Sequence, residues 1–277
     1  MIRANGIGMH VEQLDPPADE RDEVATGDGP ATLVMIHGMA SDTLASWYFT
    51  LAKPLADAGL RVLMYDLRGH GHSERPPTGY TLDDFVDDLA AMLTELDVTG
   101  PVHLLGNSFG GTIAFGYAAR HPDRVASIAT IESSPPTRAW MDRIARRLDR
   151  AVDLLPRPEA LERITAGRGE RVARRARATG EMLLTTTLAR DLPASALPSA
   201  GRISAIGVPV LCLYGADSAV VELAPAVVRL LPQARTVALP GEKHTVLIDR
   251  PEAVHRLVLA WLREECSVAV AEAAATP

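Results

Sequence analysis

Runs of consecutive apolar residues recur along the chain, and a polar turn follows each of them. They lie at 31–36, 60–65, 102–105, 125–131 and 208–214. A continuous apolar run is typical of a strand that is buried on both faces of a parallel sheet. A further strand is expected at 235–239, where the pattern is less apolar. The pattern therefore predicts a central sheet that is mostly parallel.

Helical patterns alternate with these runs. We expect helices over 43–58, 81–96, 111–120, 222–231 and 251–264. Thr81 is a suitable N-cap for the second helix, and Asp83 and Asp84 place negative charge in its first turn, where the helix dipole favours it. Alternating strands and helices predict an α/β fold with helices on both faces of the sheet.

Three parts of the chain depart from this alternation. At the start, Met1–Arg3 and Ile7–Leu14 read as strands around a hairpin turn at Asn5-Gly6, and 15–30 reads as a loop. From 133 to 206 the pattern is helical, broken by Pro and Gly, and predicts an inserted cap. We therefore expect a core made of 1–132 and 207–266, a helical cap at 133–206 and a disordered, Ala-rich tail at 267–277.

The strongest candidate for chemistry follows the apolar run at 102–105. Gly106, Ser108 and Gly110 form the pattern G-x-S-x-G between a predicted strand and a predicted helix, which is the setting of a nucleophile elbow. The turn is tight and strained, so small residues are needed on both sides of the serine. Ser108 would then project at a helix N-terminus, with the backbone N–H of Phe109 free to donate.

A serine nucleophile needs a histidine base and a carboxylate that orients the base. In elbow-type enzymes the chain order is Ser, then Asp or Glu, then His. Asp217 follows the buried run at 208–214, and His244 follows the last predicted strand. Because the carboxyl ends of parallel strands share one edge of the sheet, we expect Asp217 and His244 to converge on Ser108.

These motifs together resemble the α/β-hydrolase superfamily over the whole chain apart from the cap and the tail. The resemblance rests on His37-Gly38, Asp66-x-Arg68-Gly69-His70-Gly71-x-Ser73, Gly106-x-Ser108-x-Gly110-Gly111, Gly215-x-Asp217 and His244. It implies an α/β-hydrolase fold and a branch of the superfamily with a serine nucleophile. It is specific for the superfamily and says little about the substrate.

The resemblance also implies roles that spacing alone does not. Met39, which follows His37 and Gly38, would supply the second oxyanion N–H beside that of Phe109. Glu132 is the alternative triad acid, because some members place their acid at the end of the preceding strand.

Several other polar residues receive a structural interpretation. His37 would shape the oxyanion loop, and the turn containing His70 and His72 would be structural, since no carboxylate or Cys pattern completes a metal site. Glu222 would be a first-turn helix residue. We expect no metal and no cofactor.

Composition narrows the class of protein. The chain has 277 residues, of which 47% are hydrophobic and 23% charged, as in an ordinary globular protein. The net charge of −7 argues against nucleic-acid binding. No apolar run is long enough for a membrane span, the N-terminus shows no signal core, and the two cysteines form no framework. We therefore expect a cytoplasmic protein without a membrane span.

The predicted cap is strongly basic. Between positions 138 and 177 it holds twelve arginines, no lysine and six acidic residues. One interpretation is a solvated helix surface with i,i+4 pairs such as Arg146 with Asp142. The other is a basic face for an anionic partner, such as the phosphates of acyl-CoA or an acidic acyl carrier protein. Trp140 and the cap leucines would pack against the core or line an acyl pocket.

The sequence thus favours a Ser-His-Asp hydrolase that acts on a carboxylic ester or thioester, a small-molecule acyl substrate, through an acyl-serine intermediate. A second interpretation keeps the triad and changes the outcome, because the superfamily also contains lyases, cyclases, acyl transferases and haloperoxidase-like enzymes. A third is a binding protein that retains an unused triad. The identity of the acyl group does not follow from the fold.

Overall fold

The computed structural model describes residues 1–18 and 30–275. Its strands are β1 (Ile2–Ala4), β2 (Ile7–Met9), β3 (Val11–Leu14), β4 (Thr32–Ile36), β5 (Arg61–Tyr65), β6 (Val102–Asn107), β7 (Val125–Ile131), β8 (Val210–Gly215) and β9 (Ala234–Leu239). The loop expected at 15–30 lies largely outside the described residues.

The helices follow the alternation that the sequence predicts. They are α1 (Ala45–Trp47), η1 (Tyr48–Ala52), α2 (Lys53–Asp57), α3 (Leu82–Glu95), α4 (Phe109–Arg120), η2 (Pro122–Arg124), α5 (Arg138–Leu154), α6 (Pro158–Arg168), α7 (Glu170–Thr185), α8 (Leu188–Asp191), α9 (Ala200–Ser204), η3 (Val221–Leu223), α10 (Ala224–Leu230), α11 (Val246–Asp249) and α12 (Pro251–Ala275).

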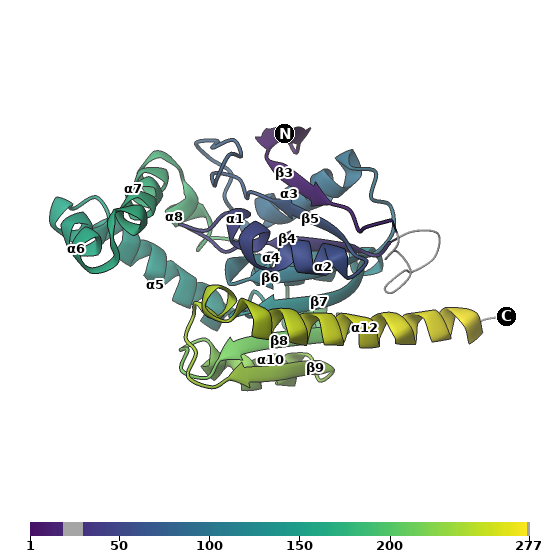
Figure 1. Ribbon diagram of the computed structural model, residues 1–277. Coiled ribbons are helices and arrows are strands. Elements are labelled where there is room, and N and C mark those ends of the chain that lie inside the picture. Colours follow the sequence, from purple (N-terminus) through teal and green to yellow (C-terminus); the bar gives the residue numbers. More distant parts are fainter. Residues whose placement is uncertain (19–29, 276–277) are drawn as a thin grey trace.

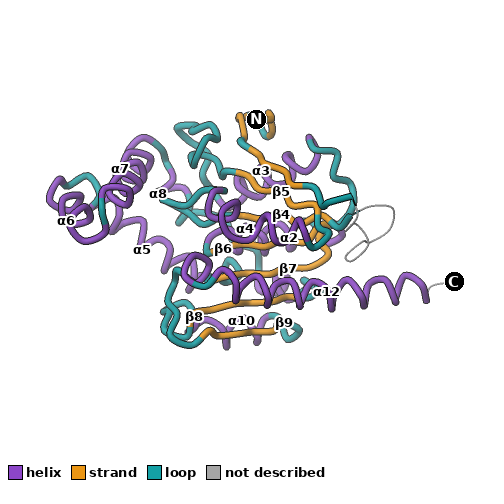
Figure 2. Tube along the Cα trace, viewed as in Figure 1, coloured by secondary structure: helices purple, strands orange, loops and turns teal. Residues whose placement is uncertain are grey.

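Seven strands form the central sheet, in the order β3-β5-β4-β6-β7-β8-β9 (Figure 2). The strand β3 pairs with β5 in antiparallel fashion, and the other neighbours pair in parallel. The strands β1 and β2 form a separate hairpin, in which Asn5 and Gly6 adopt positive φ values of 46° and 76°. This is the turn geometry that an Asn-Gly pair favours. The predicted parallel sheet is confirmed.

Each central strand is buried on both faces, as its apolar run predicts. In β4, Val34 and Ile36 join one apolar cluster, and Leu33 and Met35 join the other. The first cluster lies between the sheet and α3, α4 and α10, and the second between the sheet and α2, α11 and α12. Helices therefore cover both faces of the sheet, and α12 runs along one of them (Figure 1).

A local signal places the start of α3. The Thr81 side chain accepts a hydrogen bond from the backbone N–H of Asp84, and the Asp84 carboxylate accepts from the backbone N–H of Thr81. This reciprocal pair is a capping box. The helix expected over 43–58 is present as a continuous helical stretch from Ala45 to Asp57, with a π-helical turn, η1, between α1 and α2.

The residues from 133 to 206 form α5 to α9, which lie between β7 and β8 in the chain; α6 and α7 project beyond one end of the sheet (Figure 1), whereas α9 packs against α4 and α10 of the core. The base of this segment is attached to the core through Trp140, whose indole N–H donates to Thr112 Oγ1 over 2.6 Å. Both side chains are buried. We call residues 133–206 the helical segment.

Two details of the helices differ from expectation. The helix α12 continues to Ala275, whereas the sequence predicts a disordered tail from position 267; alanine has the highest helix propensity, and this stretch is rich in it. The pair expected between Arg146 and Asp142 is absent from the ion pairs of the described residues. Arg143 is the one member of the twelve-arginine group that forms an ion pair there.

Candidate active site

Ser108 occupies the turn between β6 and α4. Its backbone has φ 50° and ψ −117°, a conformation that is strained for a residue with a side chain. The Ser108 N–H donates to the carbonyl oxygen of Ile131 over 2.8 Å, which attaches the turn to the end of β7. The structure thus holds Ser108 at the carboxyl end of a central strand and at the N-terminus of a helix.

The glycines around Ser108 let three backbones approach one another. A Cβ atom on Gly106 would lie 2.3 Å from the backbone nitrogen of Gly111, and one on Gly110 would lie 2.0 Å from the carbonyl oxygen of Ile36. Neither position has room for a methyl group. The pattern G-x-S-x-G therefore follows from the packing of β6, α4 and β4 around the serine.

His244 lies in the loop after β9, and its partner is Glu132. Nδ1 of His244 is 2.8 Å from Oε2 of Glu132. Glu132 immediately follows β7, is fully buried, and has a φ of 54°. A buried carboxylate facing one ring nitrogen of a histidine fixes both the orientation of the ring and the nitrogen that carries the proton.

Two further donors satisfy the Glu132 carboxylate. The backbone N–H of Gly215 donates to Oε1 over 2.6 Å, and the hydroxyl of Ser218 donates to Oε2. Both donors belong to the segment at and after the end of β8. A buried charge of this kind is stable only when hydrogen bonds compensate its lost hydration, and here three groups do so.

The structure brings Glu132, and not Asp217, to His244. Asp217 is exposed, and its side chain makes no hydrogen bond or ion pair within residues 1–18 and 30–275. Its backbone N–H donates to the carbonyl oxygen of Glu242, and the next residue, Ser218, turns inward instead. The loop after β8 therefore supplies a hydroxyl to the site, whereas the sequence predicts a carboxylate from it.

The loop after β4 carries the predicted oxyanion donor Met39. Within the described part of the chain, the backbone N–H groups of Met39 and Phe109 have no hydrogen-bond acceptor. His37 supports this loop: its Nδ1 lies 2.5 Å from the carbonyl oxygen of Gly38, and its Nε2 accepts from the Leu67 N–H over 2.9 Å. His37 is fully buried, and its two hydrogen bonds join the loop after β4 to the loop after β5.

Asp42 is a site residue that the sequence analysis does not single out. Its Oδ2 accepts from the backbone N–H of Gly38 over 2.7 Å and from the side-chain amide of Asn107 over 3.1 Å, and its Oδ1 accepts from the Ser46 hydroxyl. Asp42 thus connects the loop after β4 to the residue before Ser108. Its one sequence signal is an acidic residue shortly before a helix, which many surface helices share.

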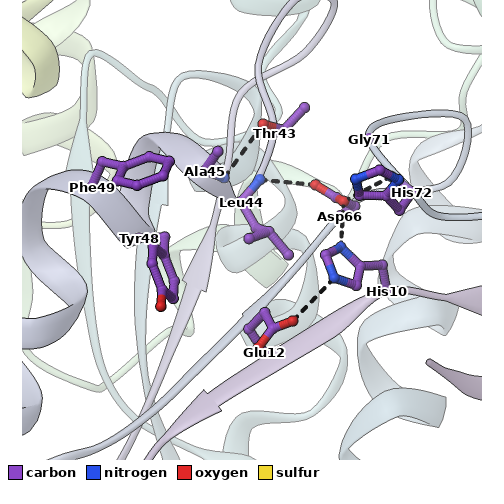
Figure 3. Close-up of a pocket in the computed structure, with 10 residues that line it drawn as sticks. All are labelled: His10, Glu12, Thr43, Leu44, Ala45, Tyr48, Phe49, Asp66, Gly71 and His72. Carbon is purple, nitrogen blue, oxygen red and sulfur yellow. Dashed lines mark hydrogen bonds and ion pairs between the residues drawn. The ribbon is translucent and has the colours of Figure 1, made fainter.

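The turn with the Asp-x-Arg-Gly-His-Gly motif is hydrogen-bonded to the loop after β4. The Asp66 carboxylate accepts from the backbone N–H groups of Leu44 and His72, each over 2.9 Å, and from His10 Nδ1 over 2.8 Å (Figure 3). Burial raises the pKa of Asp66, but these hydrogen bonds outweigh it and the net pKa is lowered. The group borders a cavity of about 310 Å³.

His70 completes this support. Its Nε2 accepts from the backbone N–H of Ala40 over 3.1 Å. Burial, reinforced by the neighbouring His37, lowers the pKa of His70 to about 4, so the ring is neutral at physiological pH. Within the described ranges, no group of three or more His, Cys, Asp or Glu side chains is arranged to hold a metal ion.

The helical segment supplies one more residue to the site. Arg147 of α5 places Nη1 3.4 Å from Nε2 of His244, the ring nitrogen opposite the one that faces Glu132. This contact depends on how α5 packs against the core, so no local pattern in the sequence reveals it.

A cleft of about 630 Å³ opens between the loop after β4 and the helical segment. Its lining residues are Ser41, Asp42, Thr43, Ala45, Ser46, Phe49, Thr50, Arg171, Arg175 and Ile248. The Arg171 and Arg175 side chains form no hydrogen bond or ion pair within the described residues. A second cavity, of about 200 Å³, shares Asp42 and Arg175 with this cleft. The lining of the cleft therefore combines apolar, hydroxyl-bearing, acidic and basic side chains.

Comparison with known proteins identifies the family. A model of the alpha/beta hydrolase fold matches residues 31–174, which is more than half of the chain. The chain therefore belongs to the α/β hydrolase family, and the predicted fold class is confirmed. In the described part of the chain, no helix has the length and apolar character that crossing a membrane requires.

Named relatives extend over most of the chain. A 2-(acetamidomethylene)succinate hydrolase from Mesorhizobium japonicum is 29% identical over 256 residues, or 85% of this chain and 89% of the relative. A non-heme chloroperoxidase from Streptomyces lividans is 28% identical over 227 residues, or 74% of this chain and 82% of the relative. These relatives share the family and differ in the reactions that their names describe.

Among solved structures, one from a study of carboxylesterases of Nitrososphaera gargenis matches with a TM-score of 0.76 and 23% identity. The match covers 95% of this chain and 97% of the other. At this identity the likeness concerns the fold.

Proposed function

We propose that this protein is a serine hydrolase that acts on a carboxylic ester or thioester. In this proposal Ser108 is the nucleophile, His244 is the general base, and Glu132 orients the base. The observation that carries the proposal is the 2.8 Å contact between Nδ1 of His244 and the buried carboxylate of Glu132. Such a pair, combined with a serine on a nucleophile elbow, makes up the Ser-His-acid arrangement of acyl transfer.

The geometry suggests how the reaction proceeds. Because Glu132 accepts the proton on Nδ1, Nε2 of His244 is left as the acceptor for the Ser108 hydroxyl proton. The Ser108 oxygen then bonds to the substrate carbonyl carbon, and the carbonyl oxygen becomes an oxyanion. The N–H groups of Met39 and Phe109 would donate to this oxyanion, and the loss of one such donor typically costs about 2.7–4 kcal/mol of transition-state stabilisation.

The remaining steps return the enzyme to its starting state. His244 gives the proton to the leaving alcohol or thiol, and an acyl-Ser108 intermediate is left. Water, deprotonated by His244, attacks the acyl carbon and releases the carboxylic acid and free Ser108.

The proposal assigns the acid role to Glu132 in place of Asp217. Glu132 is buried and in contact with the base, as an orienting acid must be. Asp217 is exposed to solvent, where it would stabilise the imidazolium only weakly.

The helical segment acts in this proposal as a cap over the substrate. The cleft of about 630 Å³ lies between it and the oxyanion loop, and Asp42 at the edge of that cleft contacts the residue before Ser108. Arg171 and Arg175 are two cations of this cleft that have no ion-pair partner among the described residues. These cations support an acyl-CoA or acyl carrier protein as an alternative source of the acyl group, through its phosphates.

A triad-dependent lyase, cyclase or acyl transferase would use the same residues with another outcome. Such enzymes differ from a hydrolase in the fate of the bound group, so their products differ while Ser108 stays essential. A binding protein with an unused triad would need no reactive serine at all.

The test compares the wild type with Ser108→Ala on a panel of 4-nitrophenyl esters and acyl-CoA thioesters. We expect turnover by the wild type, with free acid as the product, and none above background by the variant. Loss of acyl-CoA turnover with added salt, and not of turnover of the neutral esters, would support the phosphate-binding alternative. Equal turnover by both proteins would overturn the proposal.

A further inference from the structure

Arg147 contacts Nε2 of His244, the ring nitrogen that must accept a proton in the proposed reaction. Its Nη1 lies 3.4 Å from Nε2, at the long end of the hydrogen-bonding range, while Nδ1 on the other side of the ring faces Glu132. A guanidinium group has donors and no acceptor. Nε2 is therefore the unprotonated nitrogen in this arrangement, and its lone pair points toward Arg147.

The helix that carries Arg147 is fixed to the core at the two preceding turns. Trp140 donates its indole N–H to Thr112, and Arg143 forms an ion pair with Glu222 in which Nη2 and Oε2 are 2.8 Å apart. Positions 140, 143 and 147 are spaced so that they share one face of α5. The packing of this face against the core therefore presents the third side chain to the site.

Arg147 is a cation without an anionic partner. Within the described residues its guanidinium forms no ion pair, and its side chain is partly exposed and partly covered by the protein. The surrounding protein desolvates the group and lowers the pKa of Arg147, and the positive charge of Arg143 lowers it further against the attraction of Glu132. The site thus holds a positive charge next to His244, and in the described part of the chain no carboxylate lies within ion-pair distance of it.

Building on the proposed hydrolase function, we propose that Arg147 is a specificity residue that binds a free carboxylate on the substrate and thereby releases Nε2 of His244. The planar guanidinium fork matches a carboxylate with two parallel hydrogen bonds, whereas a ring nitrogen offers it one acceptor. A carboxylate next to the scissile carbonyl therefore draws Arg147 from His244.

The release matters at the moment of proton transfer. When Ser108 forms its bond to the carbonyl carbon, its proton moves to Nε2 and His244 becomes an imidazolium cation. With Arg147 still against that nitrogen, the lone pair is engaged and two cations lie side by side. A substrate carboxylate paired with Arg147 removes both obstacles, and a neutral substrate removes neither. The protein is therefore expected to favour substrates with a free carboxylate.

The first arm of the test is a pair of esters with the same leaving group, 4-nitrophenyl hemisuccinate and 4-nitrophenyl butyrate. The proteins are the wild type, Arg147→Met and the matched control Arg146→Met, whose arginine is exposed and has no partner in the described part of the chain. In Arg147→Met we expect kcat/KM for the anionic ester to fall about 10- to 100-fold, with no fall for butyrate. Arg146→Met should keep the wild-type ratio of kcat/KM for the anionic ester to kcat/KM for the butyrate ester.

The second arm does not need turnover. A neutral fluorophosphonate labels Ser108, and the labelling rate is measured with increasing succinate. We expect succinate to change the rate in the wild type and in Arg146→Met, and to have no effect in Arg147→Met. The inference is overturned if succinate acts equally on all three proteins or on none, or if the ester ratio is the same in the wild type and in Arg147→Met.

A failure of the proposed function itself is distinguishable. In that case wild-type Ser108 would not be labelled by the fluorophosphonate, with or without succinate, and the inference would fall with the function on which it rests.

Discussion

Replacing Glu132 by Gln tests how the carboxylate controls the base. The two side chains have the same shape, so the packing around Gly215 and Ser218 is kept, and the negative charge is lost. If the new amide NH₂ takes the place of Oε2, it donates toward His244 where the carboxylate accepts. Nδ1 must then be unprotonated, and the proton moves to Nε2, the nitrogen that has to receive the Ser108 proton.

The loss expected from this change is large. At the 2.8 Å separation of His244 and Glu132, an imidazolium and a carboxylate attract each other by about 6 kcal/mol at an effective dielectric constant of about 20. About 1.36 kcal/mol corresponds to a factor of ten in rate, so this attraction is worth roughly four powers of ten. The analogous Asp-to-Asn change in the serine-protease triad lowers kcat by about 10⁴.

The assay is steady-state hydrolysis of the best ester found for the wild type, with thermal unfolding of each variant as a check on folding. The matched control is Asp217→Asn, which also removes one negative charge from the same end of the sheet. We expect kcat to fall about 10³- to 10⁴-fold in Glu132→Gln and to change less than about twofold in Asp217→Asn.

The opposite pattern would refute this reasoning. If Asp217→Asn lost most of the activity while a folded Glu132→Gln kept more than about a tenth of it, the exposed acid would be the functional partner. The contact between His244 and Glu132 would then be unrelated to the reaction.

Three further predictions concern stability. Gly110→Ala would place a methyl group 2.0 Å from a carbonyl oxygen of β4 and should prevent folding or lower Tm strongly, whereas Gly167→Ala, with nothing within 4 Å, should leave Tm nearly unchanged or raise it. Arg68 Nε donates to Oδ2 of the buried Asp88 over 2.6 Å, so Arg68→Met removes the cationic partner of a buried carboxylate and should lower the free energy of unfolding in urea by about 3–5 kcal/mol. The more exposed Arg120→Met should lower it by less than about 1 kcal/mol, and equal losses in the two variants would contradict this prediction. Burial lowers the pKa of His103 to about 4, so the unfolded chain takes up this proton at higher pH than the folded protein. Stability should therefore fall from about pH 6.5 toward 4 by up to about 3 kcal/mol from this group, and His103→Gln should flatten that slope in unfolding curves measured at each pH.

The sheet was predictable because its signals are local and agree with one another. Apolar runs such as 33–36 alternate between two cores, and the Thr81 cap marks the start of α3. The course of 43–58 was less predictable, because a π-helical turn leaves no mark in hydrophobic periodicity. The length of α12 differs from the expected length for a similar reason, since an Ala-rich sequence is compatible with both a helix and a frayed end.

Within the candidate site, the predictable residues are those that a short motif or the chain order marks. Ser108 sits between glycines that the packing requires, and His244 follows the last strand. The choice of acid depends on which loop turns a side chain inward. Glu132 and Asp217 both follow buried strands, and a positive φ at the first and an inward-facing Ser218 beside the second decide the outcome.

The contribution of the helical segment was hidden for a different reason. A helix with many arginines gives no indication of which one reaches the base, because that depends on the packing of α5 against the core. The contact of Arg147 with His244 is a tertiary feature that follows from the anchor at Trp140.

The most direct measurement of the central claim is intact mass followed by peptide mapping after a rapid acid quench with a 4-nitrophenyl ester. The account predicts a transient mass increase equal to the acyl group, located on Ser108, that appears with the burst of nitrophenol and then decays as water releases the acid. The adduct should be missing in Ser108→Ala and should form slowly in Glu132→Gln. Turnover by the wild type with no adduct on Ser108, or with the adduct on another residue, would contradict it.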